Sequence, residues 1–445
     1  MSTFYRKYLH LYLQSGLSMK TITRIFYCFA TIAFLIVING RAFAQQTLIN
    51  ADAMVDVSNG KIIKNVSVLI EDNKIIQIDQ QGSINVSDAT VINMEGMTLL
   101  PGLMDMHVHL TGDAGDNFLA AKGNSVPRVT VKAVKNAKTT LMAGFTTVRN
   151  LGAKGYSVIA VRDGIIAGEI PGPRIWAAGY SIGVTGGHCD DNFSPPEANS
   201  ISAGVADGPW AVRAKVRENI KYGANTIKVC ATGGVFSKGT KVGIQQLTED
   251  EIRGAVEEAH MRGLIAAAHA HGTNGIKAAI RAGIDSIEHC SFMDDEAIKL
   301  AIEMGTYLSC DIYNTEYTLA FGEANGVPEE NMNKEKLVSK AQRDSFRKAV
   351  NAGAKMVFGS DAAIYPHGDN GKQFSRMVRF GMTPLQAIQA ATINSAQLLK
   401  QDANLGQIKA GFLADIVAVK GNPLNDVSLL ENIPFVMKDG RIYKQ

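Results

Sequence analysis

The chain has 445 residues, with 45 basic and 42 acidic side chains and a formal net charge of +3. Five of the basic residues and none of the acidic ones lie within residues 1–44, so the rest of the chain has a net charge of −2. The apparent basicity therefore belongs to the beginning of the chain, and the composition excludes a nucleic-acid partner.

Residues 1–44 have the pattern of a secretory signal peptide. Basic residues precede an apolar stretch over residues 25–38, and Ala42-Phe43-Ala44 then supplies a cleavage site of the small-x-small type. Met19 begins a leader of more ordinary length, so translation can start there or at Met1. A membrane anchor is the alternative, but the apolar stretch is short for a bilayer span. We expect an exported protein, periplasmic or secreted, cleaved near Ala44 and free of the membrane afterwards.

Two flanking segments have the alternating pattern of β-strands. Residues 45–102 contain strand-like runs separated by the hairpin signals Asn59-Gly60 and Asp72-Asn73. Residues 401–445 contain runs of the same character, GFLADIVAVKGNP and IPFVMKDGRIYKQ. Two β flanks around a central region predict one small β-sandwich domain formed by both segments.

Residues 103–400 alternate short apolar runs with helical patterns. We expect strands over residues 103–109, 146–149, 174–178, 226–230, 264–269, 286–289, 307–310 and 355–360. We expect helices over residues 129–143, 156–167, 211–222, 249–262, 276–282, 295–304 and 336–352. This alternation predicts an α/β fold, a (β/α)8 TIM barrel that binds metal. The alternative is a doubly wound open sheet, but the chain lacks a Gly-rich phosphate loop after the first strand.

Six residues at or near the ends of the apolar runs have the pattern of a metal site. His107 and His109 stand two apart on a strand, so both imidazoles point to the same side. The full set is His107, His109, Lys228, His269, His289 and Asp361. A parallel barrel gathers such strand ends at one face, and imidazole and carboxylate groups suit divalent first-row metals. A buried, hydrogen-bonded histidine pair is the alternative for His107 and His109 alone, and the joint pattern counts against it.

The cysteines do not have the pattern of a disulfide scaffold. Four follow the leader, and they are Cys189, Cys230, Cys290 and Cys310. An oxidising compartment would permit disulfides. Four cysteines in about 400 residues are too few for a disulfide framework, however, and we expect buried free thiols.

These motifs together resemble the amidohydrolase superfamily over nearly the whole chain after the leader. The matching strings are MEGMTLLPGLMDMHVHL, NTIKVCATGG, AAHAHG, GIDSIEHC, GSDAAIYPHGDNG and GQIKAGFLADIVAV. Within the superfamily the chain is most similar to the Xaa-Pro dipeptidase-like group. That group includes ochratoxin-hydrolysing amidohydrolases and is related to imidazolonepropionase.

The resemblance implies two divalent metal ions, zinc in this group, bridged by Lys228 after its carboxylation by CO2. One metal would be held by His107, His109, Lys228 and Asp361, and the other by Lys228, His269 and His289. The family pattern favours His269 over His271, although both face inward on an extended strand. Asp361 can serve as general base and acid for the water that the two metals activate.

Loop residues near the site are candidates for substrate contact. His188 follows the third strand and could polarise the scissile carbonyl as a second catalytic residue. Tyr365 and His367 lie beyond Asp361, and Tyr313 follows the seventh strand. For each, a loop residue bonded to backbone is the alternative.

The sequence favours a hydrolase of small molecules. We expect cleavage of the amide bond before a C-terminal L-amino acid, in dipeptides or N-acyl amino acids, with ochratoxin-type amides among them. One alternative is a cyclic-amide hydrolase of the imidazolonepropionase kind, but those enzymes usually lack the counterpart of Lys228. Another is a non-catalytic, metal-dependent solute-binding protein. A homo-oligomer is compatible with the sequence, and the preferred amino acid depends on loops that the sequence does not describe.

Overall fold

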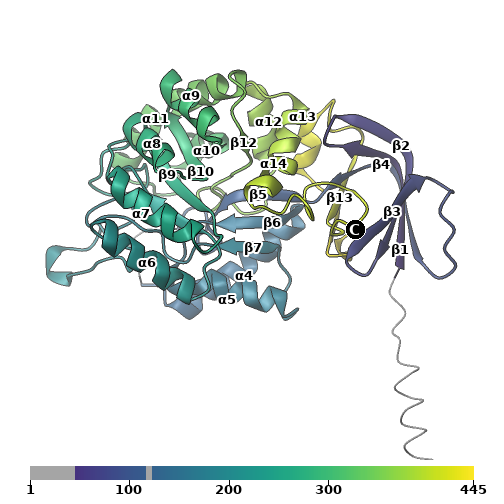
Figure 1. Ribbon diagram of the computed structural model, residues 1–445, viewed down its shortest axis with the longest axis horizontal. Coiled ribbons are helices and arrows are strands. Elements are labelled where there is room, and N and C mark those ends of the chain that lie inside the picture. Colours follow the sequence, from purple (N-terminus) through teal and green to yellow (C-terminus); the bar gives the residue numbers. More distant parts are fainter. Residues whose placement is uncertain (1–45, 117–122) are drawn as a thin grey trace, which may run out of the picture. The chain divides into compact units, whose positions relative to one another are not determined.

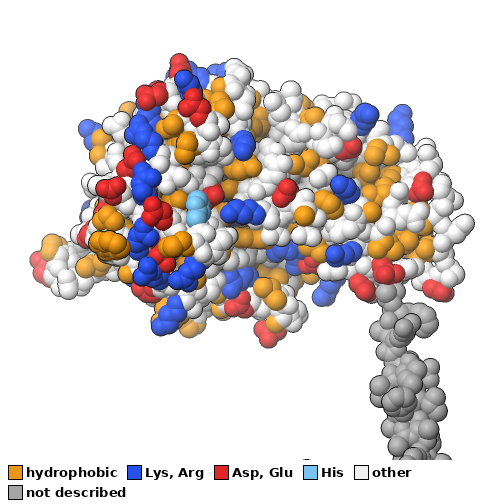
Figure 2. Space-filling view, viewed as in Figure 1, with side chains coloured by type: hydrophobic (Ala, Val, Ile, Leu, Met, Phe, Trp, Pro, Cys, Tyr) orange, Lys and Arg blue, Asp and Glu red, His pale blue; other side chains and the backbone are white. Residues whose placement is uncertain are grey.

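The computed structural model describes residues 46–116 and 123–445. The signal peptide predicted for residues 1–44 lies outside these residues. Among the helices of the described part, none is both long and apolar enough to cross a membrane. Figure 2 shows acidic and basic side chains intermingled on the face turned to the viewer, in keeping with the near-balance of charge after residue 44.

The two chain flanks share one sheet of seven strands (Figure 1). Its strands are β1 (Gln46–Asp56), β2 (Lys61–Glu71), β3 (Lys74–Gln80), β4 (Thr90–Pro101), β13 (Ile416–Lys420), β14 (Phe435–Lys438) and β15 (Arg441–Lys444). Their order is β15-β14-β13-β4-β1-β2-β3, so β13 from the end of the chain pairs with β4 from its beginning. A bridge between Lys74 and Leu413 brings the β3 edge to the segment before β13, so the sheet curls around its own apolar core.

Both hairpins predicted in this sheet are confirmed. β1 pairs antiparallel with β2, and β2 with β3. Gly60 has φ +77° in the first turn, a conformation that glycine adopts without steric cost. Asp72 has φ +52° in the second, and Asp is among the few other residues that tolerate this region.

Eight parallel strands form the barrel. They are β5 (Leu103–Val108), β6 (Phe145–Asn150), β7 (Arg174–Ala177), β8 (Ile227–Cys230), β9 (Ala266–Gly272), β10 (Ser286–Phe292), β11 (Tyr307–Ser309) and β12 (Met356–Val357). They form two sheets in chain order, β5-β6-β7 and β8 through β12. Single bridges join the sheets at both edges, Ile182 with Val229 and Val108 with Ala362. The fold class predicted from the sequence, a TIM barrel with a flanking β domain, is confirmed.

Helices cover the outside of the barrel (Figure 1). They are α4 (Val126–Met142), α5 (Ser157–Ile166), α6 (Pro209–Lys221), α7 (Glu249–His260), α8 (Thr273–Arg281), α9 (Asp295–Met304), α10 (Ile312–Phe321), α11 (Glu329–Asn351), α12 (Lys372–Arg379), α13 (Pro384–Ala390) and α14 (Ile393–Leu398). Short 3-10 helices lie at Lys154–Tyr156, Pro196–Ala198 and Val427–Glu431. Thr248 caps α7 in a reciprocal capping box with Glu251.

Three element boundaries differ from the expected ones in ways that shape the site. β9 and β10 run on to Gly272 and Phe292, beyond the predicted ends at residues 269 and 289. α11 begins at Glu329, seven residues before the predicted start. α10 was not predicted, because its residues lack a clear apolar stripe and several are β-branched or aromatic, which lowers helix propensity.

Candidate metal centre

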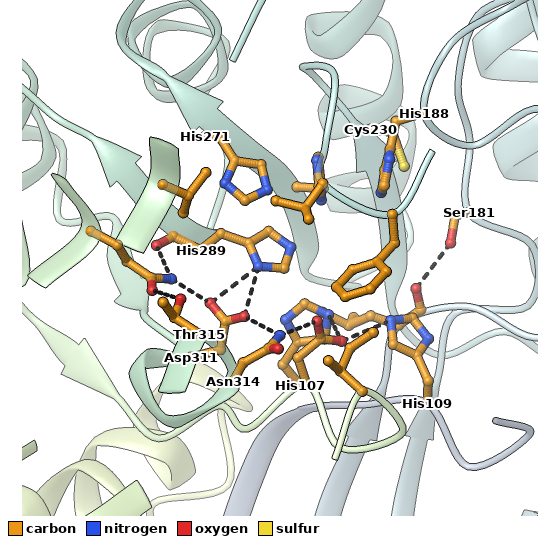
Figure 3. A pocket seen from close by; sticks show the side chains of 18 of the residues that line it. His107, His109, Ser181, His188, Cys230, His271, His289, Asp311, Asn314 and Thr315 are labelled. Atoms are coloured by element: carbon orange, nitrogen blue, oxygen red, sulfur yellow. Dashed lines mark hydrogen bonds and ion pairs between the residues drawn. The ribbon is translucent and has the colours of Figure 1, made fainter. Parts of the chain in front are cut away.

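The carboxyl ends of the barrel strands surround a cavity of about 240 Å³. All six predicted metal ligands line it, and so does His188. The six come from β5 and the residue just beyond it, β8, β9, β10 and the segment after β12. Figure 3 shows the labelled imidazoles of His107, His109, His271 and His289 grouped around this space. Residues as far apart as 107 and 361 therefore meet at one point.

His107, His109 and Asp361 form one compact group. The Nε2 atoms of His107 and His109 lie 3.5 and 3.4 Å from Oδ1 of Asp361. One potential ligand atom from each of the three residues lies within 4.8 Å of the other two. Two imidazole nitrogens and a carboxylate oxygen at this spacing fit a divalent first-row metal.

A second group contains three histidines, His269, His271 and His289. Their ligand atoms also lie within 4.8 Å of one another. Nε2 of His269 is buried without a hydrogen-bond partner, whereas Nδ1 of His271 lies 2.8 Å from the hydroxyl of Ser291. A buried imidazole nitrogen without a partner costs free energy unless something binds it, so His269 fits the metal-ligand role. The geometry also brings His271 to the site, and the preference for His269 stays a prediction.

The pKa shifts of two predicted ligands, His107 and His269, suit metal binding. Burial lowers the pKa of His107 and of His269 well below the ordinary imidazole value, so both rings are neutral and keep a lone pair for a metal. Burial also lowers the pKa of the Lys228 ammonium to about 8, while Glu288 and Asp361 oppose this shift. This shift increases the neutral fraction of the lysine amine.

Asp311 supports the site from behind, and it was not predicted. Both of its carboxylate oxygens lie 3.1 Å from Nδ1 of His289. Asn314 donates from Nδ2 to Asp311 at 2.9 Å and to Asp361 at 3.1 Å, and Gln342 donates to Asp311 at 2.9 Å. Figure 3 shows these contacts as dashed lines. A carboxylate on the far nitrogen fixes the ring orientation of a metal-binding histidine.

A buried ion pair inside the barrel lies beside His107. Arg149 Nη2 lies 2.7 Å from Oε1 of Glu288, and both side chains are fully buried. The other oxygen of Glu288 lies 3.3 Å from Nδ1 of His107. His289, next to Glu288, has φ +72°, which interrupts the strand alternation and lets neighbouring residues both reach the site. Glu288 was not among the residues predicted from the sequence.

Two of the predicted ligands have a strained backbone. His289 has φ +72° and Asp361 has φ +55°, a region that residues other than glycine rarely adopt. Such strain costs on the order of 1–3 kcal/mol per residue and is concentrated at functional sites. The backbone conformation that points these two side chains into the cavity therefore lowers the stability of the fold.

His188 lies directly against the histidine cluster. Its ring stacks on that of His269 with the centroids 3.9 Å apart, and its Nδ1 lies 2.9 Å from the hydroxyl of Ser237. A Cβ on Gly234 would come within 2.5 Å of the His188 ring and 2.7 Å of the His269 ring. Glycine is therefore needed at position 234 for this close approach.

The expectation that all four cysteines are free thiols is wrong for one pair. Cys189 and Cys230 form a disulfide, with Cα atoms 6.2 Å apart, and both line the cavity. The loop after β7 folds back over the end of β8, a contact across 41 residues that spacing along the chain does not reveal. Cys290 and Cys310 are buried and free, as predicted.

Three predicted substrate contacts lie behind the cavity and not on its wall. Tyr365 is fully buried, and its ring lies 4.7 Å from that of Tyr313. Tyr313 is capped by the guanidinium of Arg376 at 4.6 Å. Nε2 of His367 lies 3.3 Å from the backbone oxygen of His109. Tyr365 and His367 follow Asp361 in a segment that turns inward, and Tyr313 lies on α10. None of the three lines the cavity.

Comparison with known proteins places this geometry in a family. Residues 98–443 match the sequence profile of the amidohydrolase family. An ochratoxinase from Aspergillus niger is 30% identical over 426 residues, which cover 90% of this chain and 87% of the relative. An imidazolonepropionase from Symbiobacterium thermophilum is 24% identical over 396 residues, with 81% and 85% of the two chains covered.

A solved structure extends the comparison to three dimensions. A Xaa-Pro dipeptidase with methionine bound in its active site superposes with a TM-score of 0.86 and 40% sequence identity. The match covers 90% of this chain and the whole of the other. The similarity therefore includes both the barrel and the β domain.

Proposed function

Because this chain belongs to the amidohydrolase family and is a hydrolytic enzyme acting on amide bonds, we propose that it cleaves the amide bond before a C-terminal L-amino acid. The substrates would be dipeptides or N-acyl amino acids, with ochratoxin-type amides among them. The observation that carries this proposal is the convergence of His107, His109, Lys228, His269, His289 and Asp361 on one cavity. The ochratoxinase relative and the methionine-bound dipeptidase support it.

We further propose that the site holds two zinc ions bridged by carboxylated Lys228. When bound, such ions supply a nucleophilic water at neutral pH and polarise the substrate carbonyl. Asp361 would take a proton from the attacking water on a carboxylate oxygen and pass it to the leaving nitrogen. His188 lines the same cavity, and in the tautomer protonated on Nε2 it would donate to the carbonyl oxygen while Nδ1 accepts from Ser237.

A substrate panel with and without a chelator tests the proposed reaction. The panel contains Xaa-Pro and Xaa-Met dipeptides, N-acyl amino acids, an ochratoxin-type amide and a cyclic imidazolone. We expect release of the C-terminal amino acid, loss of turnover after chelation and recovery when Zn²⁺ is added back. Turnover of the imidazolone alone would favour the cyclic-amide alternative, and binding without turnover would indicate a solute-binding protein. If metal-replete protein hydrolyses no member, the proposal is wrong.

We also propose that the protein acts outside the cytoplasm. The Cys189–Cys230 disulfide is the kind of bond that persists in oxidising compartments, and residues 1–44 have the pattern of a cleaved leader. N-terminal sequencing of protein recovered from the host of origin should find Gln45 as the first residue. Intact Met1 or Met19 in the bulk of the exported protein would contradict the predicted cleavage.

A further inference from the structure

One carboxyl group on the cavity wall forms no ion pair with any described side chain. Glu335 lines the cavity and is only 3% exposed. The neighbouring Thr315 hydroxyl donates its one proton to Gln342 at 2.9 Å. Among the described residues no lysine, arginine or histidine forms an ion pair with Glu335. By contrast, Asp311 and Asp361 both have histidine partners.

The position of Glu335 is set by a rigid helix. Glu335, Val338 and Gln342 stand at i, i+3 and i+7 of α11, so they share one face, and all three line the cavity. Gln342 fixes this face through its bond to Asp311 at 2.9 Å. One residue before Glu335, Lys334 donates to the backbone oxygen of Ser237 at 2.6 Å. The backbone of Glu335 is therefore fixed by a helix and not carried by a loop.

The carboxyl group of Glu335 is buried and lacks a basic partner among the described side chains. Burial raises the pKa of its carboxyl to about 7, and nearby Asp311 adds to this, while Thr315, His289 and Arg343 act in the opposite direction. Buried carboxyl groups are unfavourable without a partner, and shifted groups in a cleft are concentrated at functional sites. A cation brought into the cavity would restore the missing interaction.

We infer that Glu335 is a specificity-determining residue that binds an ammonium or guanidinium group of the substrate. This inference rests on the proposed amide hydrolysis. Two parts of such a substrate supply the cation. One is the N-terminal ammonium of a dipeptide, which N-acyl amino acids lack, and the other is the side chain of a lysine or arginine leaving group.

Two pairs of substrates that each differ by one ammonium group test the inference and separate the two sources of the cation. Ala-Met and propionyl-Met differ only in the N-terminal ammonium, and N-acetyl-lysine and N-acetyl-norleucine differ only in the charged end of the side chain. In wild-type protein we expect kcat/KM to favour the charged member of one pair by tenfold or more. Glu335→Gln should reduce that preference to less than threefold and leave kcat/KM for the uncharged member nearly unchanged. Glu329→Gln, on the exposed first turn of α11, is the matched control and should keep the preference.

Two results would contradict a cation-binding role for Glu335. A wild type that prefers the uncharged member of both pairs, or a Glu335→Gln variant with unchanged ratios, overturns it. A purely structural role would lower the Tm of the variant without moving the ratios. If Glu335→Gln does not fold, Glu335→Asp retains the charge at a shorter reach, and the ratio should then fall without vanishing.

Failure of the proposed amide hydrolysis can be distinguished from failure of the inference about Glu335. If no member of either pair is hydrolysed, the proposed function is wrong. Calorimetric binding of the same four compounds to zinc-loaded protein then tests Glu335 independently. At least tenfold tighter binding of one charged member, lost in Glu335→Gln, supports the cation site, and equal binding of both members in both pairs overturns it.

Discussion

Asp361→Asn should lower kcat on the order of 10²–10⁴-fold, because an amide cannot take up the proton that a carboxylate accepts. Asparagine keeps the size of the side chain and an oxygen for a metal. It also tolerates the left-handed backbone at this position, where φ is +55°. The Tm should therefore change little, and steady-state kinetics with metal analysis separates the chemical loss from a folding defect.

The matched control is Asp369→Asn, which removes a carboxylate paired with Lys372 at 2.8 Å outside the cavity. That variant should keep wild-type kcat. An Asp361→Asn protein with full metal content and near-normal kcat would mean that another group moves the proton. His188 would then be the first candidate, because it lines the same cavity.

Lys228→Ala should abolish the proposed metal bridge. We expect bound zinc to fall below two ions per chain, and kcat to fall on the order of 10³-fold or more, because the activated water and the stabilisation of developing charge are both lost. Short carboxylic acids, which can occupy the space of the carbamate, should restore part of the activity. Elemental analysis, mass measurement of the wild type for carboxylation, and rescue kinetics together check this result.

The control for Lys228 is Lys277→Ala. Lys277 on α8 is also largely buried, but it lies away from the cavity and pairs with Asp294 at 2.8 Å. Its loss should leave metal content and kcat unchanged. Two zinc ions and wild-type turnover in Lys228→Ala would rule out the lysine bridge.

The sequence predicts the six candidate ligands because strand periodicity and strand ends are local properties. The spacing of His107 and His109 alone places both side chains on the same face of their strand. A barrel brings separate strand ends together whatever the course of the loops. The structure places all six on one cavity wall. Their roles at bound metals stay a prediction, which the experiments on Asp361 and Lys228 address.

The sequence did not predict which residues surround those ligands. Asp311 lies just before α10 and Glu335 lies on α11. The packing of these two helices depends on contacts far apart in the chain. The Cys189–Cys230 pair depends on how one loop folds back. Tyr365 lies behind the cavity because the segment after Asp361 turns inward, and no local pattern encodes that turn.

The sheet shared by both chain flanks has a consequence for how the protein is made. β4 emerges from the ribosome early, but its neighbour β13 follows more than 300 residues later. At 5–20 residues per second this is a delay of roughly 15–60 s. Until then one edge of β4 has no partner, and an unpaired edge strand is a template for pairing with other chains. All eight barrel strands are synthesised before β13, so the edge of β4 stays open to such pairing until the last strands arrive.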